Sequence, residues 1–259
     1  MTSQPAIAKV MRHDRMLVVS GLLLVIVLSW VYLLMGAGTM PEIGDMLVPA
    51  SAHAWTSGYA AVMLVMWAIM MAAMMLPSAA PMILLFATIE RGRRARGEQA
   101  AAAGRFASGY LVVWTVFSVG ATAIQYGLDL AALLSPAMHT TSIVVAGAVL
   151  LAAGIYQLTP FKQACLQRCR SPLEFVMAHW RDGNGGAFVM GFQHGLFCLG
   201  CCWALMLLLF VGGVMNMQWI AGLTIFVLIE KLAPAGHWLG RGAGILLIGW
   251  GAATLVAAG

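Results

Sequence analysis

Charged residues are scarce in this sequence of 259 residues, at 9% of the total, whereas hydrophobic residues make up 62%. A soluble domain carries roughly 25% charged residues, so this composition excludes a soluble enzyme domain and a disordered chain. Acidic residues are fewer still, nine against 14 Lys and Arg. In a chain this apolar, with a mean hydropathy of +0.91, the positive excess is interpreted as the orienting charge of cytoplasmic loops. No nucleic-acid partner is therefore expected.

Several familiar motifs are also missing. The five cysteines are an odd number and favour no disulfide framework. The sequence contains no phosphate-binding loop, dinucleotide-binding fingerprint, nucleophile elbow or haem-attachment motif. It shows no internal repeat, so it does not indicate an inverted-repeat transporter. The sequence leaves open whether the protein is an enzyme.

Long apolar runs dominate the chain instead. We predict an all-α, polytopic helical membrane bundle, because several runs reach the roughly 20 residues that cross a bilayer core. The first run is too long for a signal peptide and has no clear cleavage site after it. One integral membrane domain is expected over residues 1–259. Its predicted spans lie at about 16–36, 58–88, 106–128, 141–159, 186–212, 218–232 and 242–258, with an amphipathic cytoplasmic-surface helix at about 161–180.

The basic residues predict the orientation of these spans. Every Lys and Arg lies in the N-terminal tail, in residues 89–105 or 160–185, or beside the last connection, at Lys231 and Arg241. The alternate connections, residues 37–57, 129–140 and 213–217, contain none. By the positive-inside rule, seven spans run from a cytoplasmic N-terminus to a C-terminus outside. A multi-pass protein of the bacterial inner membrane, with the lipid bilayer as its partner, is expected.

The fifth predicted span carries the densest chemical signal. His194, Cys198, Cys201 and Cys202 fall within about 100° of one helix circumference. Thiolate and imidazole together suit Cu(I) or Zn(II) rather than Mg²⁺ or Ca²⁺. The alternative is that the cysteines are small buried side chains and the histidine packs between helices. We expect His194, Cys198 and Cys201 to face the bundle interior, where Gly195 and Gly200 let other helices approach closely.

A second cysteine pair precedes this span. Cys165 and Cys169 have the i, i+4 spacing that places both sulfurs on one face of the surface helix. Nearby Lys and Arg favour thiolate, although such a pair is more often structural. If the surface helix tucks inward, both cysteine clusters would share one site.

Methionines crowd the second span, which contains seven of the 19 between residues 63 and 82. Met66, Met70 and Met74 line up along the helix and are candidate weak Cu(I) ligands, because thioether sulfur is soft. Core packing is the competing interpretation. Pro77 and Pro81 predict a kink or a break in the same span.

Two charged residues complete the candidate site. Glu230 and Lys231 form either an ordinary interfacial ion pair or the counter-charge for a group bound within the bundle.

These motifs together resemble a bacterial family of uncharacterised, predicted metal-binding integral membrane proteins. The matching stretches are Met66–Met82, Lys162–Pro172, His194–Met206 and the Glu230–Lys231 pair. The similarity extends over most of residues 60–235. It implies a membrane location and metal binding, but it implies no particular reaction.

Three hypotheses about function follow. The first is an inner-membrane protein that binds, delivers or transports a soft metal ion such as Cu(I), with metal-donor or metal-acceptor proteins as partners. The second is a membrane redox enzyme that uses a metal centre or the thiols of Cys198, Cys201 and Cys202. The third is a structural Zn(II) site in a membrane scaffold. The sequence does not determine the oligomeric state.

Overall fold

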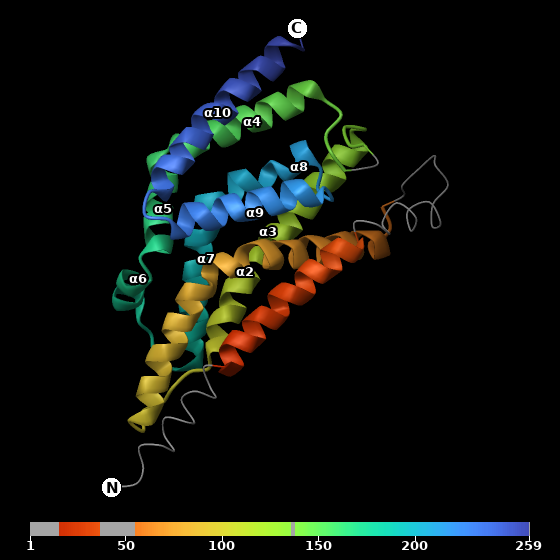
Figure 1. Ribbon diagram of the computed structural model, residues 1–259. Coiled ribbons are helices and arrows are strands. Elements are labelled where there is room, and N and C mark those ends of the chain that lie inside the picture. The colour runs from red at the N-terminus through yellow and green to blue at the C-terminus, as the bar shows by residue number, and fades with distance from the viewer. Residues whose placement is uncertain (1–15, 37–54, 136–137, 259) are drawn as a thin grey trace.

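The computed structural model of the protein describes residues 16–36, 55–135 and 138–258 (Figure 1). Its regular elements in these ranges are helices, so the predicted all-α fold is confirmed. A helix spans Met16–Gly36, which we call the N-terminal helix. The others are α2 (Ser57–Ala95), α3 (Ala103–Leu130), α4 (Ile143–Leu158), α5 (Pro160–Arg170), α6 (Pro172–His179), α7 (Gly183–Leu207), α8 (Leu209–Gly212), α9 (Met217–Leu232) and α10 (Gly236–Val256).

A helix lies in each of the seven predicted ranges. Among the described residues, five helical segments are long and apolar enough to cross a membrane: the N-terminal helix, α2, α3, α7 with α8, and α10. Helices α4 and α5 qualify as a sixth when taken together, although the chain bends by 64° between them. Helix α9 has only 16 residues. Seven crossings and their orientation therefore remain predictions.

The predicted surface helix over residues 161–180 is wrong as a single element. It is two helices, α5 and α6, with Ser171 between them. Pro172 explains the break, because proline has no backbone N–H to continue a helix but is well suited to the first turn of the next one. Helix α5 is not a purely surface element either, since Lys162, Cys165 and Leu166 are buried.

Helix α2 bends near its middle (Figure 1). It is continuous through Pro77 and Pro81, so the predicted kink is present and a break is not. Pro77 cannot donate to the carbonyl of Ala73, one turn earlier. The indole of Trp30 in the N-terminal helix donates to that carbonyl instead, at 3.2 Å. A side chain from a neighbouring helix thus satisfies the backbone group that the proline leaves free.

Glycines bring α3 and α7 into close contact. A Cβ on Gly109 of α3 would clash with the backbone of Phe188, and a Cβ on Gly191 of α7 would clash with the backbone of Phe106. Gly195 meets Val113 in the same interface. Small residues allow such close backbone approach in membrane helices. The predicted role of Gly195 is therefore confirmed, and α7 is held firmly against α3.

Helices α4 and α10 form a second close pair, which lies side by side in Figure 1. Gly147 and Gly154 of α4 face Gly251 and Gly244 of α10, leaving no space for larger side chains. Helix α9 contacts both α2 and α10 and so connects the α4–α10 pair to the helices around α2.

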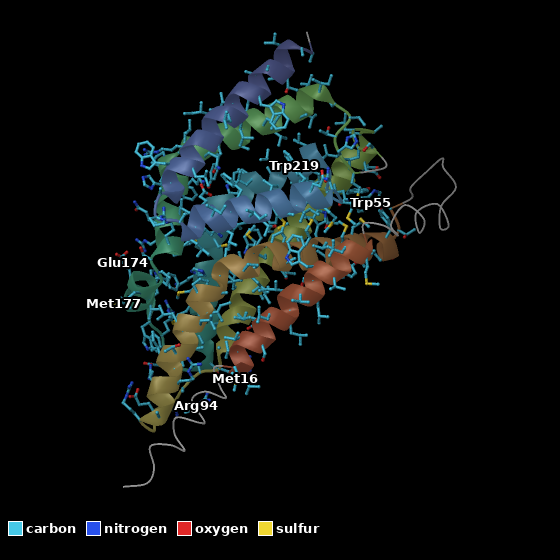
Figure 2. The ribbon with its side chains drawn as sticks, in the orientation of Figure 1. Met16, Trp55, Arg94, Glu174, Met177 and Trp219 are labelled. Atoms are coloured by element: carbon cyan, nitrogen blue, oxygen red, sulfur yellow. The ribbon has the colours of Figure 1, made fainter. Side chains whose placement is uncertain are left out.

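One end of the bundle carries a cluster of charged residues around Arg93. Figure 2 shows Met16 and Arg94 together at this end, with Trp55 and Trp219 well away from it. Arg93 pairs with Glu98 at 3.0 Å and with Asp182. A hydrogen bond from the Trp180 indole, at 3.0 Å, and the Arg93 guanidinium hold the pKa of Asp182 below its ordinary value. This cluster ties the end of α2 to the start of α7.

Candidate functional site

Three cysteines of α7 form the centre of the site. Cys198, Cys201 and Cys202 are buried, as is His194, so the prediction that this face points into the bundle is confirmed. The thiols of Cys201 and Cys202 both turn toward the backbone carbonyl of Cys198, at 3.0 and 2.9 Å. Their sulfur atoms therefore lie on one side of the helix, one turn beyond Cys198.

Helix α5 brings the second cysteine pair to this centre. The sulfur atoms of Cys169 and Cys201 are 3.9 Å apart. The close approach depends on Gly200, because a Cβ there would lie 2.7 Å from the sulfur of Cys165. Cys165 itself is buried against this glycine. The sequence left open whether α5 tucks inward, and the structure places it against α7.

Helix α2 contributes a methionine to the same centre. The thioether sulfur of Met75 lies 3.8 Å from the sulfur of Cys202. Met66, Met70 and Met74, the methionines selected from the sequence, are all buried in α2. Met75 is the one at the thiols, and it occupies a different face of α2 from these three, because consecutive residues differ by about 100° around a helix.

Polar groups from three helices surround Cys198. Its sulfur lies 2.9 Å from the ammonium of Lys231 in α9 and 3.0 Å from the hydroxyl of Tyr110 in α3. The ammonium also donates to Ser78 of α2, at 3.2 Å. A lysine beside a cysteine stabilises the thiolate, which is the form that binds metal. Lys231 therefore contacts a thiol of α7 inside the bundle, and its role as the counter-charge for a bound group stays a prediction.

Glu230 has a different partner. Its carboxylate pairs with Lys162 of α5, and both side chains are fully buried. The interpretation of Glu230 and Lys231 as a mutual ion pair is wrong, because neighbours on a helix point in directions about 100° apart. Arg170 of α5 donates to the carbonyls of Ala233 and Pro234 at the end of α9, at 2.5 and 2.7 Å. These contacts fix α5 to α9 and so hold Cys169 in place.

His194 lies one turn of α7 before Cys198 and packs among aromatic rings. Its ring is buried among the rings of Phe106, Tyr110 and Phe175, with centroids 6.0, 5.8 and 5.3 Å away. Its Nδ1 atom is buried without a hydrogen-bond partner in the part of the chain that the structure describes. In the same residues, no group of three or more His, Cys, Asp or Glu side chains converges as a metal site. The closest sulfur pairs are Cys169 with Cys201, at 3.9 Å, and Cys202 with Met75, at 3.8 Å, and the Cys198 thiol interacts with Cys169, Cys201 and Cys202.

These pairs have a spacing that suits a metal ion. With the metal–sulfur bond of about 2.3 Å that zinc thiolates show, two sulfur atoms on one ion lie at most about 4.6 Å apart. The Cys169–Cys201 pair at 3.9 Å and the Cys202–Met75 pair at 3.8 Å are within that limit. Thiolate and thioether are the donors that select Cu(I).

Sequence reasoning missed four residues of this site: Met75, Tyr110, Ser78 and Lys162. Lys162 was considered only as a basic residue that favours thiolate at Cys165 and Cys169, not as the partner of Glu230, and Met75 only as one member of a methionine run. The sequence did offer one signal for Lys162: it lies three positions before Cys165, and so on nearly the same face of α5 as that buried cysteine. The contacts of Tyr110 and Ser78 depend on how the helices pack, which a single helix pattern does not contain.

Comparison with known protein families identifies a match over most of the chain. A family model described as "PpoB2: Copper chaperone" matches residues 64–254. This range includes all the residues assigned to the site above. No curated protein and no solved structure matches the chain.

Proposed function

Because the chain belongs to the PpoB2 copper chaperone family, we propose that it binds Cu(I) in the bacterial inner membrane and delivers it to a partner protein. The family supports the copper-handling part of this proposal. The five or six helical segments long and apolar enough to cross a bilayer support a multi-pass membrane location. Their alternating loop charges favour a cytoplasmic N-terminus.

The observation that carries the proposal is the meeting of sulfur atoms from three helices. Cys169 of α5, Cys201 and Cys202 of α7, and Met75 of α2 lie in two close pairs around one turn of α7. Packing alone would not require these particular residue types at both contacts. A soft monovalent ion prefers this donor set over the oxygen ligands that hard cations need.

The thiols are proposed to hold the ion and the methionines to exchange it. Thiolates bind Cu(I) more tightly than neutral thioethers, and movement needs sites from which an ion can leave. Met66, Met70 and Met74 are buried in the part of α2 between Trp55 and the thiols. They are proposed as a weak relay toward Met75 and Cys202.

Copper analysis of the detergent-purified full-length protein tests the tight site. Wild type should retain stoichiometric Cu(I), and Cys201→Ser or Cys169→Ser should lose most of it. Cys165→Ser is the matched control, because this buried thiol packs beside Gly200, whereas the Cys169 sulfur lies 3.9 Å from the Cys201 sulfur. A wild-type protein that takes up no Cu(I), or a Cys165→Ser variant that loses as much as the other two, would contradict the proposed ligand set.

Loading kinetics test the relay separately. Replacing Met66, Met70 and Met74 with Leu nearly conserves volume, so each change should cost less than about 1.5 kcal/mol of stability. The triple variant should retain Cu(I) at the thiols but load it more slowly. Met82→Leu is the control, because Met82 is buried in the same helix on the other side of Met75. Unchanged kinetics in the triple variant would return these methionines to a packing role.

A thiol redox enzyme is the second candidate, favoured by the 3.9 Å separation of the Cys169 and Cys201 sulfurs. Disulfide formation would need these sulfurs to approach to about 2.05 Å. Mass spectrometry of metal-free protein under a quinone oxidant distinguishes the candidates. Rapid, reversible disulfide formation with no Cu(I) uptake would favour the enzyme. Elemental analysis that finds zinc in place of copper would favour a structural Zn(II) site.

A further inference from the structure

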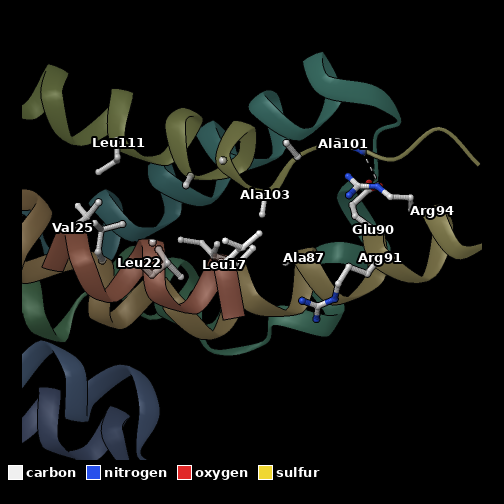
Figure 3. A pocket seen from close by; sticks show the side chains of 17 residues that line it. Leu17, Leu22, Val25, Ala87, Glu90, Arg91, Arg94, Ala101, Ala103 and Leu111 are labelled. Atoms are coloured by element: carbon white, nitrogen blue, oxygen red, sulfur yellow. Dashed lines mark hydrogen bonds between the residues drawn. The ribbon is translucent and has the colours of Figure 1, made fainter. Parts of the chain in front are cut away.

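A groove separate from the sulfur centre lies between the N-terminal helix, α2 and α3 (Figure 3). Its volume is about 420 Å³, within the range of about 300–1,000 Å³ typical of ligand pockets. Along most of its length the walls are aliphatic, with Leu17, Leu22 and Val25 on one side and Leu111 on another. An occupant must therefore be apolar over most of its length.

One end of the groove is different, because Glu90, Arg91 and Arg94 line it there. The Glu90 carboxylate is already engaged, since it accepts a hydrogen bond from the backbone N–H of Ala101 at 2.9 Å. Arg91 uses one guanidinium nitrogen to donate to Thr88 at 2.7 Å. Its Nη1 atom is buried and has no hydrogen-bond partner among the described residues.

This arrangement selects for an anionic group attached to a long apolar chain. A buried guanidinium nitrogen without a partner is costly, and a phosphate oxygen would satisfy it with a charge-assisted hydrogen bond. Basic pockets between helices on the cytoplasmic side of a membrane commonly bind acidic lipid headgroups. The basic loop of residues 89–105 predicts that this end of the bundle is cytoplasmic.

We propose that the groove binds one anionic phospholipid, with an acyl chain between the N-terminal helix and α3 and its phosphate at Arg91. This inference rests on the membrane location in the proposed function, but not on copper binding. The lipid would fill the gap between the N-terminal helix and the rest of the bundle at that end. The aliphatic walls of the groove would then be covered by an acyl chain, without a protein partner.

Lipid retention by the purified full-length protein tests the headgroup contact. The protein is reconstituted into vesicles of equal parts phosphatidylglycerol and phosphatidylcholine, extracted in mild detergent and analysed by native mass spectrometry. Wild type should keep one phosphatidylglycerol in preference to phosphatidylcholine. Arg91→Gln should reduce that preference about tenfold, as expected for a lost charge-assisted hydrogen bond. Arg105→Gln is the control, because Arg105 is exposed near the same end and does not line the groove.

A second variant tests the apolar part. A Cβ on Gly21, which lines the groove, would meet no atom within 4 Å, so Gly21→Leu should fold and occupy the space of the acyl chain. It should reduce retention of both lipids, whereas Gly120→Leu, at an equally open position outside the groove, should not.

Three results would overturn the inference: equal retention of the two lipids by wild type, equal effects of Arg91→Gln and Arg105→Gln, or full lipid retention by Gly21→Leu. Copper content is measured on the same preparations. Loss of lipid preference with copper retained rejects the groove alone, and lipid preference without copper rejects only the proposed copper site.

Discussion

The hydrogen bond from Trp30 to the carbonyl of Ala73 provides a direct test of how the bend in α2 is stabilised. Pro77 removes the N–H that would bond this carbonyl, and the Trp30 indole replaces it at 3.2 Å. In Trp30→Phe the ring stays apolar but the donor is lost. An unsatisfied buried carbonyl costs about 1–3 kcal/mol, and we expect a free energy of unfolding lower by that amount.

The same substitution should cost much less in a Pro77→Ala background. There the backbone N–H of residue 77 can bond the carbonyl of Ala73 within the helix, and the indole is no longer needed. A double-mutant cycle should therefore give a coupling energy of about 1 kcal/mol or more, within the range for residues in direct contact.

The assay is reversible unfolding of the purified protein in mixed micelles with increasing SDS, followed by circular dichroism. Trp250→Phe is the control, because Trp250 is half exposed on α10, and its cost should be the same in both backgrounds. If Trp30→Phe costs as much in the Pro77→Ala background as in the wild-type background, then the indole does not compensate for the proline, and this explanation of the bend is refuted.

Three further outcomes are expected. Gly200→Val should push α5 away from α7, because its Cβ would lie 2.7 Å from the Cys165 sulfur. Copper retention should then fall although all five cysteines remain. Gly222→Val, at an open position, should retain copper. Lys162→Met should lower the free energy of unfolding by about 3–5 kcal/mol, because it leaves the carboxylate of Glu230 buried and unpaired, whereas Lys162→Met with Glu230→Leu should recover most of the loss in the same SDS titration. Asp182→Asn should lower the melting temperature at neutral pH, because Trp180 and Arg93 depress the pKa of Asp182. This stabilisation is present above the ordinary aspartate pKa of about 3.9 and is lost as the pH falls through the lower pKa of the folded state. The melting temperatures of wild type and variant should therefore converge in acid.

Helix positions were largely predictable, because an apolar run of membrane-spanning length is a property of the local sequence. The face of α7 was predictable for the same reason: His194, Cys198 and Cys201 recur with the helical period, and all three are buried. The break at Ser171 was also within reach, since Pro172 favours the first turn of a new helix.

The partners of these faces were not predictable from periodicity. A helical pattern indicates which residues share a side, but not which other helix lies against it. Met75 instead of Met74 reaches Cys202, in the turn of α2 that the prolines bend. Lys162 instead of Lys231 pairs with Glu230, because α5 folds inward over Gly200.

The contact between Lys231 and Cys198 bears on the valence of the ion that the proposed site would hold. If two of the thiols bind as thiolates and the others stay neutral, a monovalent ion there would carry a formal charge of minus one, and the ammonium 2.9 Å from the Cys198 sulfur would bring the sum to zero. A divalent ion on the same two thiolates would be neutral, and the lysine would then add an uncompensated positive charge. Charge imbalance is costly in an interior of low dielectric constant. A single buried lysine can therefore favour Cu(I) over Zn(II) without touching the metal.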